Sequence, residues 1–240
     1  MDFVEYISDR KFWKSEHRLL ARKLGAKGLA EEMGIPTPKT ICVTSSVEKL
    51  PRLISGVYKA NCGYSGKRVV AYHQGFDLLH REAITHDDIH RILDAPGQGP
   101  NDQYICEELI TYNGELANDL KILSFNGVNA VIMFKHIASR RLAWYSLDWR
   151  RLPPIHPIHK CPYSNPDCEY PRPPQLAEAL DWASRISKRL GTFIRVDFLV
   201  GDNGVYLGEL TPTPNGGQNY TPFGRDLLSV YCQHLLPDSP

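Results

Sequence analysis

The sequence lacks a long apolar segment. None of its hydrophobic runs approaches the roughly 20 residues that a membrane-spanning helix needs. The first five residues, Met1 to Glu5, have neither the basic start nor the apolar centre of a signal peptide. We therefore expect a cytoplasmic protein with no membrane partner.

The sequence also has no excess of charge of either sign. Lysine and arginine number 28, aspartate and glutamate 27, and the net charge is +1. This balance gives no reason to expect a nucleic acid or an anionic surface as a partner. The six cysteines follow no framework spacing, so we expect reduced thiols rather than a disulfide scaffold.

Two common catalytic devices are missing. No serine or cysteine triad is recognisable, and the glycine-rich segment Asn61 to Lys67 does not have the Gly-Lys-Ser/Thr start of a helix that defines a P-loop. The segment lies between two apolar runs that read as strands, Gly56–Ala60 and Arg68–Tyr72. Its bare amides are suited to a flap that closes over phosphates. The alternative is a flexible hairpin tip.

What is present is an ordinary globular composition: 240 residues, 42% hydrophobic and 23% charged, enough for one large or two small domains. Helical patterns alternate with antiparallel hairpins, which is typical of the α+β class. The helices that we expect are Arg10–Met33 with a break at Gly25, Ser46–Ile54, Phe76–Leu93 and Gln175–Leu190. The strands that we expect, besides those above, are Thr40–Val43, Gln103–Glu108, Asp119–Phe125, Val128–His136 and Arg141–Trp149, the third and fourth joined by an Asn126-Gly127 turn.

A hairpin near the C-terminus carries an unusual set of charges. Its strands run from Gly191 to Val200 and from Val205 to Pro212. A two-residue turn at Asn203-Gly204 puts Asp197 and Glu209 on opposite faces, whereas a three-residue loop, Asp202 to Gly204, places them opposite each other. We favour the three-residue loop.

Two facing carboxylates repel each other, and a shared divalent cation is one reason for them to coexist. Arg195, on the same face, suggests a phosphate as a third party. The competing interpretation is an ordinary hairpin with a surface pair between Arg195 and Asp197.

The segment from Arg151 to Pro174 is rich in proline and has no periodicity, so we predict a long loop that covers substrate. It contains four residues that zinc can bind, but their spacing matches no common structural zinc pattern. These residues are His156, His159, Cys161 and Cys168.

Taken in order, these segments resemble the ATP-grasp superfamily, and in particular its branch associated with teichuronopeptide biosynthesis. The resemblance rests on Arg22-Lys23-Leu24, Gly34 to Pro38, Lys59 with the glycine loop, Tyr104 to Ile110, Asp119-Leu-Lys121 with Asn126-Gly127, Arg195-Val-Asp197-Phe and Gly208-Glu-Leu-Thr211. It implies two α+β lobes with antiparallel sheets that grip ATP between them. The implied parts are a helical segment 1–39 that packs on the C-terminal lobe, a small lobe 40–108 with the flap, and a large lobe 109–240 with the metal site.

The resemblance also implies roles for individual residues. ATP would be bound by Lys23, Lys59, the flap residues Gly63, Ser65 and Gly66, the segment Glu107, Glu108, Leu109 and Ile110, and by Glu115 and Lys121. Magnesium, as two ions, would be bound by Asp197, Glu209 and Thr211. Arg195 and Lys121 would act on the transferring phosphate.

Two features depart from the family pattern. Many relatives have asparagine where Thr211 stands. Threonine is a poorer metal ligand, and it leaves room for water, Asn215 or Asn219 to bind the metal. We also expect the chain to lack the separate N-terminal domain that helps to bind substrate in many relatives. We therefore place the acceptor site at the proline-rich loop, at a partner, or at Asn215, Gly216 and Gly217. Arg140 and Arg141, with Arg150 and Arg151, are candidates to hold an acidic substrate, the alternative being a solvated basic face.

The activity that the resemblance implies is an ATP-dependent ligase that joins a carboxylate to an amine through an acyl phosphate. The carboxylate would belong to a small molecule or to a carrier-bound acid. The sequence also allows a homodimer. Two alternatives remain at this point: a small-molecule kinase on the same scaffold, and a nucleotide-binding module that has lost activity.

Overall fold

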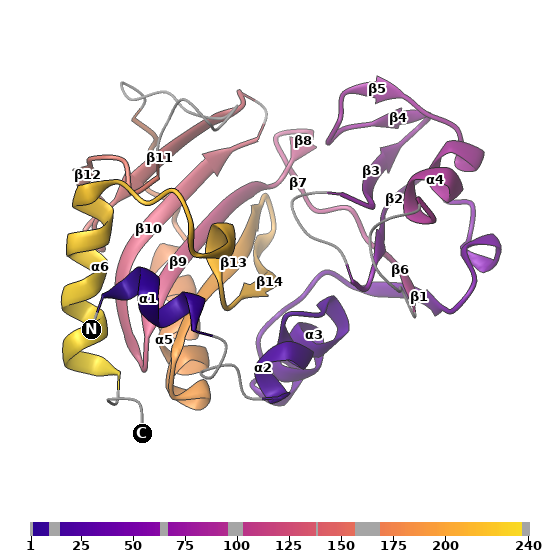
Figure 1. The fold of residues 1–240 in the computed structure, drawn as a ribbon. Coiled ribbons are helices and arrows are strands. Elements are labelled where there is room, and N and C mark those ends of the chain that lie inside the picture. Colours follow the sequence, from indigo (N-terminus) through magenta and orange to yellow (C-terminus); the bar gives the residue numbers. More distant parts are fainter. Residues whose placement is uncertain are drawn as a thin grey trace.

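The computed structural model describes residues 2–9, 15–62, 67–95, 103–137, 139–156 and 169–236. Two antiparallel sheets of six strands stand side by side, as Figure 1 shows. The larger sheet has the order β12-β11-β10-β9-β13-β14. Its strands are β9 (Asn118–Phe125), β10 (Val128–His136), β11 (Arg141–Tyr145), β12 (Arg151–Leu152), β13 (Phe193–Gly201) and β14 (Gly204–Thr211).

The smaller sheet has the order β1-β6-β2-β3-β4-β5. Its strands are β1 (Thr40–Thr44), β2 (Ser55–Ala60), β3 (Val69–His73), β4 (Phe76–Asp77), β5 (Glu82–Ala83) and β6 (Tyr104–Glu107). Helix α4 (His86–Leu93) covers its outer face, where Ile89 and Leu93 join a buried cluster with Tyr58 and Val70. A short ribbon of β7 (Thr111–Tyr112) and β8 (Glu115–Leu116) follows β6 and leads into the larger sheet.

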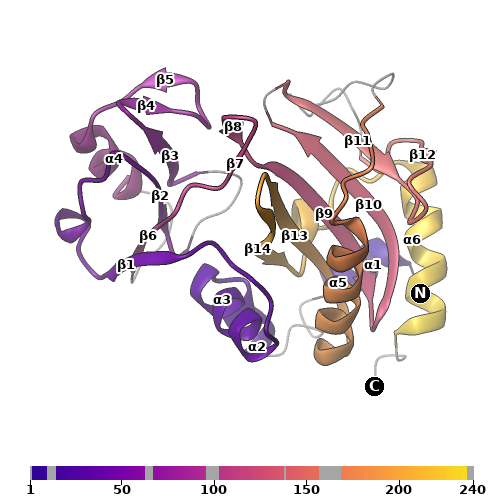
Figure 2. The same ribbon diagram turned by 180° about the vertical axis from the view of Figure 1, so that it is seen from behind.

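Helices cover both faces of the larger sheet (Figures 1 and 2). Helix α5 (Leu176–Leu190) packs on the face that carries Ile122 and Val196, and α3 (Lys23–Glu32) joins the same core against β14. On the other face, α1 (Phe3–Ser8) and α6 (Pro222–Leu235) bury Phe125 and Phe193. The rest of that second face is left to the polar side chains of the site. No helix among the described residues is long and apolar enough to cross a membrane.

The α+β class and the two antiparallel sheets agree with the sequence. The Asn126-Gly127 turn joins β9 to β10 as expected, with both residues at positive φ. Helix α5 ends at Gly191, which takes the left-handed conformation of a helix C-cap. The domain boundaries at residues 39 and 108 stay predictions.

The C-terminal hairpin corrects one expectation and confirms another. The turn is Asp202-Asn203, because Gly201 pairs with Gly204, so the predicted three-residue loop is wrong. A bulge then shifts the register between Phe198, which pairs with Leu207, and Asp197, which pairs with Glu209. The extra residue is Gly208. The two carboxylates therefore face each other, as predicted, through a bulge rather than through the turn.

The predicted helix Phe76–Leu93 is wrong over its first half. That half contains β4 and β5, and only His86–Leu93 is helical. The buried Asp77 accepts hydrogen bonds from the backbone of Ala71 and Leu79, which hold a turn instead. A capping box between Thr85 and Asp88 then begins the helix.

Three other boundaries also differ. Only a 3-10 turn, Val47–Lys49, forms within the predicted helix Ser46–Ile54, and the strand expected over Arg141–Trp149 ends at Tyr145. The N-terminal helix breaks between α2 (Ser15–Leu20) and α3 rather than at Gly25. Gly25 lies against the backbone of Leu19, where a Cβ would come within 2.0 Å of the carbonyl oxygen.

Gly201 fixes the tip of the hairpin against the segment between the two sheets. A Cβ on Gly201 would lie 2.5 Å from Ile110 Cγ2 and 2.9 Å from the Thr111 carbonyl oxygen. Beside it, the Asp202 amide donates to that same carbonyl at 2.9 Å. We expect Gly201→Val to lower the free energy of unfolding by ~1–3 kcal/mol, the usual cost of overpacking, measured by urea denaturation.

The matched control is Gly28→Ala. Gly28 is exposed on α3 with no atom near its Cβ position, so this change is expected to raise stability by about 0.5–1 kcal/mol. Equal stabilities of the Gly201→Val variant and the parent would contradict the close packing at the hairpin tip.

Candidate functional site

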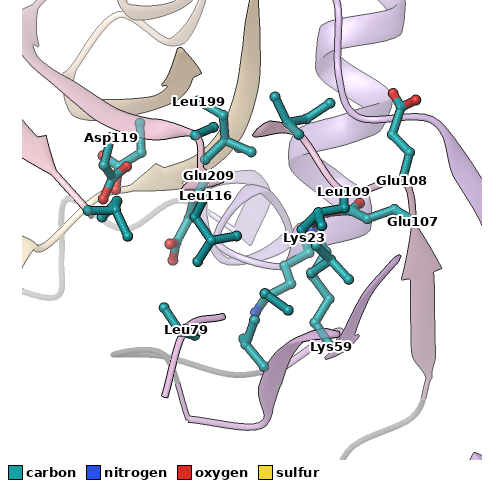
Figure 3. A pocket seen from close by; sticks show the side chains of 18 of the residues that line it. Lys23, Lys59, Leu79, Glu107, Glu108, Leu109, Leu116, Asp119, Leu199 and Glu209 are labelled. Carbon is teal, nitrogen blue, oxygen red and sulfur yellow. Dashed lines mark hydrogen bonds and ion pairs between the residues drawn. The ribbon is translucent and has the colours of Figure 1, made fainter. Parts of the chain in front are cut away.

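A cavity of about 250 Å³ lies between the two sheets. Its apolar walls come from both lobes, with Val57, Val69, Ala71 and Leu79 on the smaller sheet and its loops, and Leu109, Ile110, Leu116, Ala117, Ile137 and Leu199 on the other side. Its charged lining consists of Lys23, Lys59, Lys121, Glu107, Glu108, Asp119, Asp197 and Glu209 (Figure 3). The structure thus brings together nine of the residues predicted to bind nucleotide or metal, among them Leu109 and Ile110.

The lysines at the smaller sheet converge on Glu107, whose side chain is 3% exposed. Lys59 donates to Oε1 of Glu107 from the adjacent strand β2, where it lies two residues beyond Val57, the direct cross-strand partner of Glu107 on β6. Lys23, at the start of α3, lines the same cavity (Figure 3). Burial lowers the pKa of Lys23, although the charge of Glu209 opposes this effect.

A row of side chains crosses the larger sheet at the other end of the cavity. Cross-strand pairing sets Met133, Lys121, Asp197 and Glu209 side by side on β10, β9, β13 and β14. Lys121 Nζ lies 2.5 Å from Asp197 Oδ2 and 2.9 Å from Asp119 Oδ2. Burial opposes the charged form of Lys121, but Asp119 and Asp197 together raise its pKa.

Asp197 is held by two cations at once. Arg195 donates from Nε to Oδ1 at 2.7 Å and from Nη2 to Oδ2 at 2.6 Å, and Lys121 shares Oδ2. Burial would raise the pKa of Asp197, but the charges of Arg195 and Lys121 outweigh it and lower the pKa. Asp197 is therefore a buried, ionised carboxylate with both oxygens engaged.

Glu209 differs from Asp197 in having no such partners. It lines the cavity opposite Asp197, and its carboxylate makes no hydrogen bond or ion pair with the parts of the chain that the structure describes. Its charge acts through space on Lys23 and Arg195. The cavity thus contains one carboxylate free to bind a cation.

Several predicted site residues lie elsewhere or face away. Glu108 directs its carboxylate away from the cavity (Figure 3), where Oε1 accepts from the Lys39 amide at 2.6 Å. Glu115 is exposed on β8 and does not line the cavity. Thr211 Oγ1 accepts a hydrogen bond from Arg195 at 3.0 Å rather than facing the cavity. Their roles toward ribose and metal stay predictions.

The predicted substrate residues fall into two groups. Arg140 and Arg141 are exposed at the turn between β10 and β11, outside the cavity. Asn215, Gly216 and Gly217 all have positive φ and belong to η4 (Pro214–Gly217), the turn that follows β14. The flap residues Gly63, Ser65 and Gly66 lie outside the described residues, as do His159, Cys161 and Cys168 of the zinc alternative.

The loop at Asn215 is supported by the N-terminal helix. A Cβ on Gly217 would lie 2.3 Å from Ser8 Oγ, and Thr213 Oγ1 donates to the Ile7 carbonyl at 3.4 Å. Nδ1 of His156, from the proline-rich segment, lies 3.0 Å from the side-chain Nδ2 of Asn215, and the His156 ring packs at a 45° tilt against Tyr220. The loop predicted to bind substrate is therefore braced by two segments distant in sequence.

Three charged residues at or near the site were not singled out from the sequence as binding residues. Asp119 lines the cavity two residues before Lys121, on the same strand face, and Lys135 lies 3.8 Å from it. Lys27 lies one helical turn after Lys23 and contacts Glu107. The spacings of two along a strand and four along a helix were the available signals.

Comparison with solved structures shows the same fold in ATP-grasp enzymes. A D-alanine-D-alanine ligase from Helicobacter pylori is 16% identical with a TM-score of 0.54, covering 91% of this chain and 62% of its own. One from Bacillus anthracis is also 16% identical, at 0.53, covering 91% and 65%.

The ATP-grasp ligase PsnB, in complex with minimal precursor, Mg and ADP, is similar too. It is 16% identical with a TM-score of 0.51, covering 91% of this chain and 60% of its own. The chain thus spans about three fifths of the length of these structures. No curated protein matches it. The family described as TupA-like ATP-grasp matches residues 55–228, most of the chain, and with the two sheets and the charged cavity between them this shows that the chain belongs to the TupA-like ATP-grasp family.

Proposed function

We propose that the protein is an ATP-dependent ligase that activates a carboxylate as an acyl phosphate and transfers the acyl group to an amine. One observation carries the proposal: the cavity between the sheets combines apolar walls with lysines from three elements and the carboxylate of Glu209, which has no partner among the described residues. This composition suits a flat base, a row of phosphates and a cation, in that order across the cavity.

The end of the cavity at the smaller sheet suits adenine. Leu109, Ile110 and Val57 offer flat apolar surface there. Glu107 closes this end as a buried carboxylate, with Lys59 on Oε1 and Lys27 3.0 Å from Oε2.

The other end suits phosphate and magnesium. Lys59, Lys121 and Lys23 provide positive charge along the cavity, and Arg195 extends the row behind Asp197. Asp197 and Glu209 would hold Mg²⁺, with Thr211 as the third residue implied by the family. Carboxylate oxygens are the ligands that Mg²⁺ prefers, and the ion would supply neutralisation of phosphate charge.

Asp197 must exchange partners before it can bind an ion. Lys121 and Arg195 hold both of its oxygens, and these same cations are the ones needed at the phosphates. Binding of a nucleotide would move Lys121 and Arg195 from the Asp197 carboxylate to phosphate oxygens. The two buried cations would then keep an anionic partner, and Mg²⁺ would take their place at Asp197.

The chemistry needs no side-chain nucleophile. An oxygen of the substrate carboxylate attacks the γ-phosphorus in line, the new O–P bond forms, and the bond to the β,γ-bridging oxygen breaks to release ADP. The amine nitrogen then attacks the acyl carbon, loses a proton, and inorganic phosphate leaves. Lys59, Lys121 and Arg195 would stabilise the charge on the transferring group and hold it in line.

The test is ADP release measured across amino acids, sugar acids and carrier-bound acids, each with and without an amine. We expect ADP release with one class of acid, and hydroxylamine in place of the amine should give a hydroxamate. If ADP is released while an alcohol is phosphorylated and no hydroxamate forms, the protein is instead a kinase. Binding of ATP without turnover of any acid would indicate a nucleotide-binding module.

A further inference from the structure

Helix α3 carries two lysines on one face, and they do different things. Lys23 lines the cavity, whereas Lys27, four residues later, lies behind Glu107 and outside the cavity lining. Lys27 Nζ donates to the Pro38 carbonyl at 2.5 Å and lies 3.0 Å from Glu107 Oε2. Its side chain is 14% exposed. A lysine buried to this extent beside a carboxylate is a specific arrangement rather than a solvated surface charge.

Glu107 therefore has two cationic partners, one on each oxygen. Lys59 donates to Oε1, and Lys27 lies beside Oε2. Burial lowers the pKa of Lys27, while Glu107 opposes this effect and Lys59 adds to it. Glu107 thus has an ammonium group beside each of its buried oxygens, and the charge of Glu108 also favours the charged form of Lys27.

The two lysines are not equivalent with respect to the cavity. Lys59 lines it and faces the space between the sheets, so its ammonium group is able to turn toward a bound phosphate. Lys27 is fixed by the Pro38 carbonyl and lies outside the lining. If Lys59 left Glu107 in the absence of Lys27, a buried carboxylate would remain without a cation, which is strongly unfavourable.

We propose that Lys27 is a positioning residue: it keeps Glu107 charge-compensated so that Lys59 is released to bind the phosphates of the nucleotide. The inference rests on the proposed function, because it assumes that a nucleotide enters this cavity. Lys27 itself contacts neither phosphate nor base. Its contribution should grow with the phosphate charge of the ligand, because only a charged ligand draws Lys59 away.

A purely structural role makes a different prediction. Helix α3 packs on β14 of the larger sheet, where the Leu207 amide donates to the Pro36 carbonyl at 2.8 Å, while Glu107 belongs to β6 of the smaller sheet. The pair of Lys27 and Glu107 therefore also ties the two sheets together. If this tie were its only role, loss of Lys27 would weaken all ligands of the cavity alike.

The experiment compares the affinities of adenosine, AMP, ADP and ATP with Mg²⁺, measured calorimetrically for the full chain. In Lys27→Met we expect ATP and ADP to bind about tenfold more weakly, the size of effect of one charge-assisted interaction, with adenosine changed less than threefold. In turnover, KM for ATP should rise while kcat is kept. Lys27→Arg should restore ATP binding to within threefold of the parent.

Two further variants separate the possible causes. Lys27→Gln keeps a donor for the Pro38 carbonyl but has no charge, so it should bind the four ligands as Lys27→Met does. If Lys27→Met does not fold, Lys27→Gln is used in its place. Lys39→Met removes an exposed neighbouring lysine whose recorded contacts are through its backbone, and it should bind all four ligands as the parent does.

Three outcomes would overturn the inference. If Lys27→Met loses affinity for all four ligands equally, only the structural tie between the sheets remains as a role for Lys27. If Lys27→Met binds ATP as tightly as the parent, Lys27 has neither the positioning role nor the structural one. A parent protein that binds none of the four ligands would overturn the proposed function and this inference with it. Either of the first two results, with a parent that binds ATP, would overturn the inference alone.

Discussion

Replacing Glu209 by glutamine is expected to lower kcat for ADP release by on the order of 100-fold or more, the scale found when one group that stabilises transition-state charge is removed. The change keeps the size of the side chain and removes the one cavity carboxylate that has no partner among the described residues. ATP turnover should be measured over a range of Mg²⁺ concentrations, because a lost metal ligand raises the concentration needed for half-maximal rate.

The free energy of unfolding should not change with the loss of activity. Glu209 balances no ion pair in the described part of the chain, so its neutralisation should leave the free energy of unfolding within about 0.5 kcal/mol of the parent. Glu178→Gln is the matched control, since Glu178 is exposed on α5, and its activity should equal that of the parent. Full activity of Glu209→Gln at low Mg²⁺ would show that the metal is not held there.

The hairpin that carries Glu209 shows what could be read from the sequence. The alternation of Ile194, Val196 and Phe198 predicts which face enters the core, and these residues do lie in the core under α5. The pairing of Asp197 with Glu209 was also predicted. The predicted three-residue loop is wrong because the turn is one residue shorter and a bulge at Gly208 compensates for it. Local periodicity does not distinguish a residue added at the turn from one added along the strand.

The parts of the site that could not be predicted are those made by tertiary packing. Lys27 reaches Glu107 only because α3, which packs on β14, brings it next to β6, and no spacing in the chain connects residues 27 and 107. The sequence predicts helix over the β4–β5 hairpin because Asp77, a buried residue that organises its turn, has the pattern of a surface charge. The order of the motifs along the sequence, by contrast, predicted most of the charged residues that line the cavity. Each motif lies on one strand or one loop, so its residues stay together in the fold.

Asp197→Asn is expected to destabilise the protein by ~3–5 kcal/mol, the cost of removing one partner from a buried ion pair. The side chains of Asp197 and Lys121 are 4% and 8% exposed. The variant leaves Lys121 with the ion pair to Asp119, and Arg195 with the hydrogen bond to Thr211. Urea denaturation at neutral pH measures the loss. The lowered pKa of Asp197 sets the pH dependence: the stabilisation is present above the pKa of an unfolded aspartate and is lost as pH falls through the lower folded value.

A double-mutant cycle distinguishes charge compensation from simple packing. Lys121→Met combined with Asp197→Asn removes one cation together with the carboxylate, so the double variant should be more stable than the sum of the two single losses predicts, by about 1–3 kcal/mol. Arg225→Met with Asp2→Asn is the control pair, because Arg225 and Asp2 form an ion pair at the surface, where coupling is at most about 1 kcal/mol. Strict additivity at Lys121 and Asp197 would mean that these two charges do not depend on each other. In that case the exchange of Lys121 from Asp197 to phosphate, on which the proposed charge redistribution depends, would have no energetic basis, and the lysine would have to be compensated by Asp119 alone.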